Sequence, residues 1–277
     1  MKKIDIHCHT TNRLVNGTVD GNASIRNIRL YMNRYDVERT VLLASYFPHK
    51  GTGISNFRLL RWIERHDKGM KRFILFASLD IDRYPLAGYN EIEELANEGV
   101  LGGIKIYTCY QDVFLCSDAM RDIMVLAAKH GLPVMFHSGL SYACRRKYGI
   151  NSPARMYTAE HFRTFAADNP EVNIILSHMS KPHFHEIVDV CESCPNVYTD
   201  MSGIIDSKYD EDEIPVCVEE IRTFLRKVGP EKMLFGTDFP VQTHEHSVRF
   251  VEEATEGMGD DVRAKIYFSN AERLLRL

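Results

Sequence analysis

Eight short apolar runs, rich in β-branched residues, recur along the chain and constrain its fold more than any other feature. They lie at 3–7, 39–45, 72–79, 103–107, 132–137, 172–178, 196–201 and 232–238. Between them lie amphipathic segments with helical spacing, such as 55–66, 117–130, 158–167 and 216–227. Strands that alternate with helices predict parallel βα units. Eight such units within 277 residues predict one α/β domain, a (β/α)8 TIM barrel that spans residues 1–277.

The segment 117–130 shows how local chemistry supports this prediction. Ser117 is a candidate N-cap, and Gly131 stands where a helix commonly ends in a left-handed residue. The cap is followed by an apolar stripe with helical spacing, formed by Met120, Ile123, Met124 and Ala127. The next run, 132–137, is apolar on both faces, as expected for a strand between helices and a barrel interior.

An open doubly wound sheet is the competing architecture. Its usual G-x-G-x-x-G turn after the first strand is missing, and Gly51 and Gly53 form only an isolated pair. The most irregular segments, 10–22, 138–157 and 202–215, all follow predicted strands. In a barrel they would lie at the C-terminal, active-site end.

Charge and composition argue against several partners and locations. The formal net charge is −4 and no long run of Lys or Arg occurs, so nucleic acid is not the expected partner. No apolar stretch reaches the roughly 18 residues of a membrane span, and the one after Lys2 and Lys3 is too short for a signal peptide. The seven cysteines are too sparse for a secreted disulfide scaffold. We therefore expect a cytoplasmic protein that does not bind membranes.

Several apolar runs end in side chains that can bind a metal ion. Alternation along a strand places His7 and His9 on one face. Three later runs end in His137, His178 and Asp238. The C-terminal ends of barrel strands meet at one mouth, so the five side chains should converge there. A single histidine is more often a buried structural residue, but five ligand-type residues at strand ends favour a metal centre.

Six short segments carry a resemblance to a known family. They are DIHCH at 5–9, GIKIY at 103–107, FHSG at 136–139, LSH at 176–178, FGTDFP at 235–240 and NAERLL at 270–275. In this order and spacing the whole chain resembles the amidohydrolase superfamily. Within it, the chain is similar to the amidohydrolase-related (amidohydrolase 2) branch of metal-dependent barrel hydrolases and decarboxylases.

The resemblance implies one divalent metal ion, Zn²⁺ or alternatively Mn²⁺ or Fe²⁺, held by His7, His9, His137 and Asp238. His178 would either ligate the ion or orient the reacting water and the substrate oxygen. A bound metal can lower the pKa of water from about 15.7 towards 7. Asp238 would accept the proton of that water and pass it to the leaving group, so Asp238 and His178 are the expected catalytic residues.

Lys105 and Tyr107 share one face of the fourth run, so both should point into the barrel and contact substrate. In binuclear relatives a lysine on this strand is carboxylated and bridges two metals, whereas the branch resembled here is usually mononuclear. We expect one metal and an unmodified Lys105, paired with a substrate carboxylate or an inward acid. Arg145 and Arg146, in the loop after His137, could also bind an acidic substrate, with a solvated loop as the alternative.

Three other pairs of ligand-type residues stand outside this set: His183 and His185, His244 and His246, and Cys191 and Cys194. The histidine pairs follow strands six and eight, where we expect solvated or substrate-loop residues. The cysteine pair lacks the second pair of a zinc ribbon, so we expect it to pack in a helix.

The favoured function is a metal-dependent hydrolase that uses a metal-activated water on an ester, lactone or amide of a small molecule, which could be anionic. A decarboxylase of an aromatic or unsaturated carboxylic acid is the alternative, and Lys105 suits it. Metal-dependent deoxyribonucleases and phosphoesterases also begin with a His-x-His strand, but many of them have a glutamate where Lys105 stands. A non-catalytic barrel would not need Asp238 and His178. A homo-oligomer is compatible with each of these functions.

Overall fold

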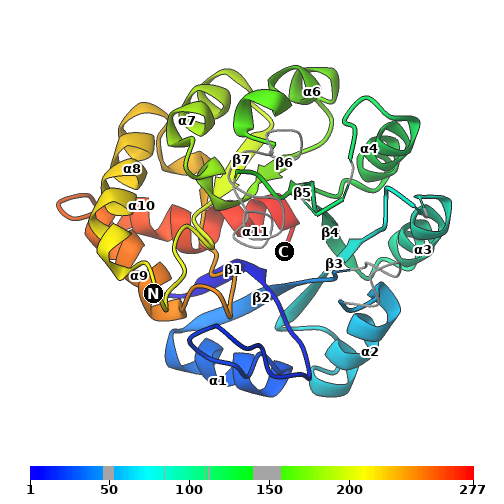
Figure 1. Ribbon diagram of the computed structural model, residues 1–277, viewed down its shortest axis with the longest axis horizontal. Coiled ribbons are helices and arrows are strands. Elements are labelled where there is room, and N and C mark those ends of the chain that lie inside the picture. The colour runs from blue at the N-terminus through cyan, green and yellow to red at the C-terminus, as the bar shows by residue number, and fades with distance from the viewer. Residues whose placement is uncertain (46–52, 84, 109, 112, 140–156) are drawn as a thin grey trace. The chain divides into compact units, whose positions relative to one another are not determined.

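The computed structural model describes residues 1–45, 53–83, 85–108, 110–111, 113–139 and 157–277. Eight strands form one sheet in chain order (Figure 1). They are β1 (Lys3–Cys8), β2 (Val37–Leu43), β3 (Phe73–Ser78), β4 (Leu101–Ile106), β5 (Val134–Phe136), β6 (Ile174–Leu176), β7 (Val197–Asp200) and β8 (Met233–Leu234). The strand pairs with a defined register are parallel. Parallel strands in chain order, each followed by a helix, make the fold a (β/α)8 barrel, as the sequence predicts.

Within the described residues, each strand is followed by an α-helix. These helices are α1 (Ile25–Arg34), α2 (Asn56–His66), α3 (Pro85–Asn97), α4 (Asp118–His130), α6 (Arg163–Asp168), α7 (Phe184–Ser193), α8 (Ile214–Lys227) and α9 (His244–Ala254). The last part of the sequence adds α10 (Asp260–Ala264), a π-helical turn at Lys265–Ser269 and α11 (Asn270–Leu275). Within the described ranges, no helix is long and apolar enough to cross a membrane.

Helix α4 begins and ends where the sequence predicts. The Ser117 hydroxyl accepts a hydrogen bond from the Met120 N–H at 3.3 Å, which satisfies one of the backbone donors left free at a helix start. Gly131 ends the helix with φ 62, a conformation that costs glycine little. The predicted apolar stripe is buried.

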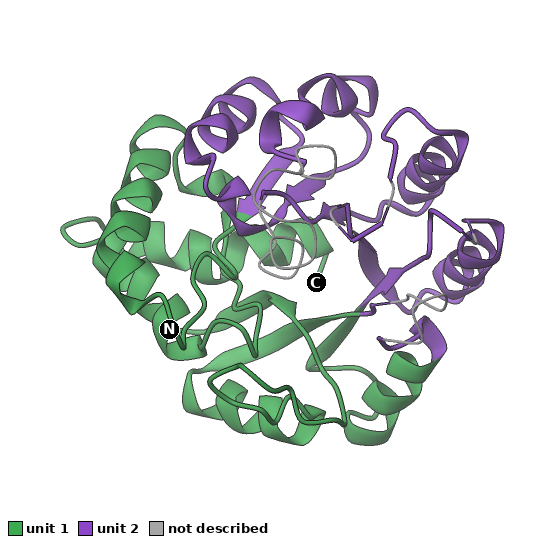
Figure 2. Ribbon diagram, in the orientation of Figure 1, with its two compact units in different colours: residues 1–43, 58–75, 200–277 green, residues 44–57, 76–199 purple. Residues whose placement is uncertain are grey.

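The chain divides into two compact units (Figure 2). Unit 1 consists of Met1–Leu43, Arg58–Leu75 and Asp200–Leu277, and unit 2 of Ala44–Phe57 and Phe76–Thr199. In unit 1, β1 pairs with β2, and α8 lies against α9. In unit 2, strands β4 to β7 pair without a register shift, so their carboxyl ends lie level. Side chains that directly follow these strands are therefore brought to the same edge of the sheet.

β5, β6 and β8 are shorter than their predicted runs by three residues or more. β5 ends at Phe136, β6 at Leu176 and β8 at Leu234. The predicted runs 172–178 and 232–238 end in left-handed backbone, because φ is 64 at His178 and 54 at Asp238. A residue in this region cannot continue a strand. The candidate ligands His178 and Asp238 therefore lie beyond the strands rather than within them.

Candidate active site

Three of the predicted metal ligands converge in unit 1: His7, His9 and Asp238, which we call the His7 site. Asp238 Oδ1 lies 3.0 Å from His9 Nε2 and 3.4 Å from His7 Nε2. The ligand atoms of the three side chains all lie within 4.8 Å of one another. His7 is buried, whereas the His9 side chain is 29% exposed and that of Asp238 is 15% exposed. The donor atoms thus face one another at a place that small molecules can reach.

Backbone hydrogen bonds between β1 and the segment after β8 hold the His7 site together. The Asp238 N–H donates to the His7 carbonyl at 2.7 Å, and the His9 N–H donates to the Phe239 carbonyl at 2.9 Å. Asp238 keeps its left-handed conformation although a side chain makes this conformation unfavourable. Such strain persists where surrounding contacts impose it, often at functional sites.

The buried carboxyl group of Asp5 ties the same two segments together. Its Oδ1 accepts from the His7 N–H at 3.1 Å and from the Thr237 N–H at 3.0 Å. Its Oδ2 accepts from the Thr237 hydroxyl at 2.7 Å. Burial raises the pKa of Asp5 to about 7, although these hydrogen bonds favour the ionised form. Asp5 therefore fixes the spacing between the two chain segments that carry the ligands.

Two residues that sequence reasoning missed face the other ring nitrogen of His7. Asp200 Oδ2 lies 3.1 Å and Ser202 Oγ 2.9 Å from His7 Nδ1. Both residues are completely buried. Asp200 is the last residue of β7, so the rule that selected the other strand-end ligands would also have found it. Ser202 carries no comparable signal in the sequence.

Close packing around His7 requires glycine at position 236. A Cβ atom on Gly236 would lie 3.1 Å from the Ser202 Cβ and 3.2 Å from the His7 Cβ. Carbon atoms in favourable contact are about 3.5–4.0 Å apart, so a side chain here would push both neighbours. Because Gly236 has no side chain, the backbone after β8 lies close to His7.

The other two predicted ligands face each other within unit 2. His178 Nε2 lies 3.1 Å from His137 Nδ1, and the ring centroids are 4.7 Å apart. The His137 N–H donates to the Ile106 carbonyl at 2.9 Å, and its own carbonyl accepts from the Thr108 hydroxyl. His178 begins a run of three residues with positive φ. Unit 1 thus brings together three of the five predicted ligands, and unit 2 brings together the other two.

Lys105 and Tyr107 lie on the same side of the chain at β4, as alternation predicts. The Lys105 ammonium donates to the Ser177 hydroxyl at 2.9 Å and lies 5.4 Å from the centroid of the Tyr107 ring. Lys105 is 1% exposed, so its charge is held away from bulk water. Arg145 and Arg146, the other predicted substrate contacts, lie outside the described residues.

His244 is not solvated, which corrects the expectation from the sequence for this residue, whereas His246 is partly exposed. His244 begins α9 and is completely buried, with its ring stacked on Tyr31 at 5.2 Å between centroids. His246 Nδ1 lies 2.8 Å from the Ser207 hydroxyl. Both contacts are made with residues distant in the sequence, so the local pattern could not reveal them.

The other two pairs agree with their predicted roles. His183 and His185 lie at the start of α7, where His185 is exposed. Cys191 and Cys194 are buried at the C-terminal end of the same helix. Burial without a second cysteine pair is consistent with packing rather than metal binding.

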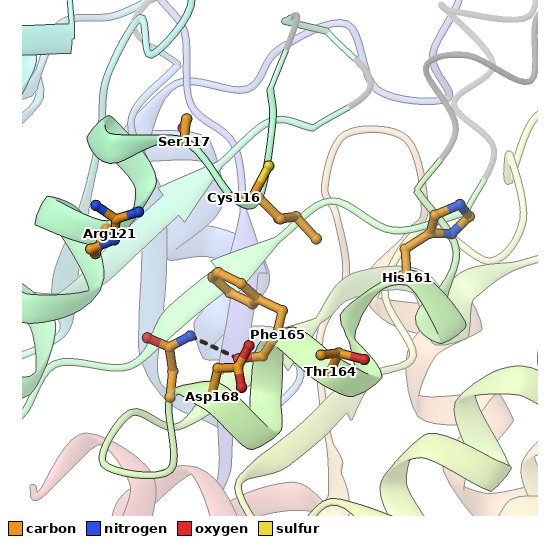
Figure 3. A pocket seen from close by; sticks show the side chains of 9 residues that line it. Cys116, Ser117, Arg121, His161, Thr164, Phe165 and Asp168 are labelled. Atoms are coloured by element: carbon orange, nitrogen blue, oxygen red, sulfur yellow. Dashed lines mark hydrogen bonds between the residues drawn. The ribbon is translucent and has the colours of Figure 1, made fainter.

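A separate pocket of about 500 Å³ opens in unit 2 between the N-terminal end of α4 and α6 (Figure 3). Its described lining includes Cys116, Ser117, Arg121, His161 and Asp168. Among the described residues of this lining, none is predicted for the active site. Arg121 also forms an ion pair with Asp118 at 2.7 Å.

Solved structures share this fold over the whole chain. An amidohydrolase from Burkholderia multivorans with bound zinc has a TM-score of 0.72 at 16% identity, and both chains are covered completely. The 5-carboxyvanillate decarboxylase from Sphingomonas paucimobilis has a TM-score of 0.70 at 18% identity, covering 100% of this chain and 99% of its own. A probable 2-pyrone-4,6-dicarboxylic acid hydrolase from Acinetobacter baumannii, with citric acid bound, has a TM-score of 0.70 at 13% identity, and both chains are covered completely. At these identities the likeness establishes the fold alone.

The sequence itself identifies the family. No curated protein matches the chain. A family model described as Amidohydrolase matches residues 4–277 and so includes every predicted ligand. The donor set of the His7 site, two imidazoles and a carboxylate, fits a divalent metal ion of the kind bound by such enzymes. The chain therefore belongs to the amidohydrolase family.

Proposed function

We propose that the chain is a metal-dependent hydrolase that cleaves an ester, lactone or amide bond of a small molecule. The convergence of His7 Nε2, His9 Nε2 and Asp238 Oδ1 carries this proposal. Imidazole nitrogens and a carboxylate oxygen suit a catalytic Zn²⁺ ion, with Mn²⁺ or Fe²⁺ as alternatives. The partial exposure of His9 and Asp238 supports access of substrate to the site.

We assign His137 as a fourth ligand. His178 is assigned as either a further ligand or the group that orients water and the substrate oxygen. His137 directly follows β5, and His178 is the second residue after β6. In (β/α)8 enzymes the catalytic groups come from the C-terminal ends of several strands, which supports these assignments. The proposal is one divalent ion per chain.

Asp238 is the proposed proton acceptor. When bound, the metal lowers the pKa of water from about 15.7 towards 7. Asp238 Oδ1 faces both imidazoles of the His7 site and is partly exposed to solvent. From this position Asp238 accepts the proton of the attacking water and delivers it to the leaving group.

Metal analysis and a substrate panel test the hydrolase proposal. Mass spectrometry of the purified protein should find about one divalent ion per chain. A panel of lactones, esters and amides should contain a substrate, and Asp238→Asn should lower its rate of turnover by about 10²–10⁴. Asp118→Asn removes an exposed carboxylate from α4 and should leave the rate unchanged.

Two results would overturn the assignment. One is turnover by Asp238→Asn within about threefold of the parent, because a general base contributes far more than this. The other is an unchanged metal content in both His7→Ala and His9→Ala, which would place the ion elsewhere.

A metal-dependent decarboxylase of an aromatic or unsaturated carboxylic acid is the second candidate. The buried ammonium of Lys105 favours it, because a cation that bulk water does not reach suits a substrate carboxylate. Several proteins of this fold are decarboxylases by name, including 2,6-dihydroxybenzoate decarboxylase from Rhizobium. An anionic substrate would suit either reaction.

Product analysis separates the two candidates. Release of carbon dioxide from aromatic or unsaturated acids, without hydrolysis of any ester or amide, would favour the decarboxylase. Lys105→Met should then weaken binding or turnover of the acid while the metal content stays the same. A metal content near two per chain together with activation by bicarbonate would instead indicate a carboxylated Lys105 that bridges two ions.

A further inference from the structure

We propose that Asp200 is a positioning residue that holds the His7 ring with its hydrogen on Nδ1, so that the Nε2 lone pair faces His9 and Asp238. The proposal rests on the metal centre proposed above. It adds a residue that the five predicted ligands do not include, and it assigns a tautomer to the central ligand of the His7 site.

Asp200 accepts two hydrogen bonds from Ser202. Its Oδ1 accepts from the Ser202 N–H at 3.0 Å and from the Ser202 hydroxyl. Both bonds come from the turn that directly follows β7, so the carboxylate is held in one orientation. Its second oxygen, Oδ2, points at His7 Nδ1 from 3.1 Å.

The hydrogen-bond partners around His7 place the ring hydrogen on Nδ1. Ser202 has a single hydroxyl hydrogen, and this hydrogen is donated to Asp200. The Ser202 oxygen, 2.9 Å from His7 Nδ1, is therefore an acceptor there. The Asp200 carboxyl oxygen, 3.1 Å from His7 Nδ1, is likewise an acceptor there. Since these two contacts both require a hydrogen from Nδ1, Nδ1 is the donor, and a neutral ring then has its lone pair on Nε2.

Burial strengthens the hydrogen bond that holds the His7 ring in this orientation. Asp200 and Ser202 are completely buried and His7 is 1% exposed, so bulk water is kept from the bond. A hydrogen bond to an ionised group is stronger than one between neutral groups, and a low local dielectric strengthens it further. Gly236 packs close to the Cβ atoms of both His7 and Ser202. Carboxylates that orient a ligating histidine in this way typically contribute 10–100-fold to metal affinity.

The first experiment reads the tautomer directly in metal-free protein. Nitrogen-15 NMR of histidine-labelled protein distinguishes a protonated from an unprotonated ring nitrogen, and the His7 signals are identified by their loss in His7→Gln. We expect a hydrogen on Nδ1 in the parent. A hydrogen on Nε2 in the parent would overturn the proposal, whatever the protein binds or catalyses.

The second experiment measures Zn²⁺ affinity by competition with a chromophoric chelator. Asp200→Asn should raise the dissociation constant by roughly 10–100-fold, and Ser202→Ala should raise it less. Ser207→Ala is the matched control, because it removes a hydroxyl 2.8 Å from the ring of His246 and should leave the affinity unchanged. Circular dichroism shows which variants fold. If Asp200→Asn does not fold, the Zn²⁺ affinity of Ser202→Ala decides the test.

The two experiments separate this inference from the proposed function. Equal Zn²⁺ affinity in the parent and a folded Asp200→Asn would overturn the positioning role while the metal centre stands. A parent that binds no divalent ion would overturn the metal-dependent function, and the NMR result would still decide the tautomer.

Discussion

At the scale of single residues, His244 of unit 1 is a completely buried histidine surrounded by aromatic rings. Its ring stacks on Tyr31 and Tyr35, with interplanar angles of 8° and 16°. Among the described residues neither ring nitrogen has a hydrogen-bond partner, and the nearest carboxylate oxygen, Asp5 Oδ2, is 3.7 Å from Nε2. Burial lowers the pKa of His244 to about 3, so the ring is neutral at physiological pH.

This depressed pKa predicts a pH-dependent contribution to stability. Between pH 6.5 and about 3 the unfolded chain binds a proton at His244 that the folded protein does not bind. The stability that this group contributes is therefore present above pH 6.5 and is lost as the pH falls. The loss is about 1.4 kcal/mol per pH unit where the unfolded chain binds one full proton more than the folded protein. His244→Phe keeps an aromatic ring but cannot take up the proton. Relative to the parent, its free energy of unfolding should rise by roughly 2 kcal/mol between pH 7 and pH 5.

Urea unfolding at a series of pH values measures this difference. His185→Phe, which changes an exposed histidine, is the control and should follow the parent. If the curves for His244→Phe and the parent are parallel over this range, the ring is not held neutral by burial.

Single-residue roles were predictable from the sequence only where a local rule applies. Alternation predicted that His7 and His9 share a face, and strand ends predicted Asp238. The burial of His244 depends on aromatic rings that approach it only after folding. Ser202 likewise acquires its role from the ring of a histidine far away in the chain.

At the scale of elements, the signals at helix ends were more reliable than those at strand ends. Ser117 and Gly131 bound α4 as predicted, because each acts on the backbone of its own helix. β6 and β8 end before the left-handed residues His178 and Asp238, and Asp238 is held by a distant contact, the bond from its N–H to the His7 carbonyl. The apolar pattern of the sequence alone does not predict such contacts.

The cap of α4 provides a prediction at this scale. Ser117→Ala removes the acceptor for the Met120 N–H and should lower the free energy of unfolding by about 1 kcal/mol. Ser269→Ala is the control, since Ser269 precedes α11 without a side-chain capping bond, and it should change stability by less than about 0.5 kcal/mol. Equal effects of the two substitutions in urea unfolding would show that the Ser117 hydroxyl does not cap the helix.

At the scale of the whole molecule, the eight apolar runs were sufficient to predict the (β/α)8 fold. Their regular alternation with helices leaves few other ways to bury every strand on both faces. Substrate choice was not predictable in the same way, because it depends on loops that this fold varies freely. Arg145 and Arg146, predicted from such a loop, remain a hypothesis.

The whole molecule should become more stable when a metal binds its native state. Free Zn²⁺ at 100 times its dissociation constant should raise the free energy of unfolding by about 2.7 kcal/mol. His9→Ala removes a partly exposed ligand, so the variant should fold and lose most of this gain. His185→Ala, at an exposed histidine outside the predicted ligand set, should keep it. Thermal unfolding with and without Zn²⁺ measures the gain, and an equal gain in His9→Ala would point to a different binding site.

The pairing of β1 with the segment after β8 also has a consequence for protein synthesis. Asp5 and Thr237, which join these segments, are 232 residues apart in the chain. A ribosome therefore makes His7 and His9 before β2 to β8, and makes Asp238 only after all eight strands have been translated. Until then the nascent chain offers two imidazoles without the carboxylate of Asp238. The proposed metal centre can therefore form only once the segment after β8 has been made.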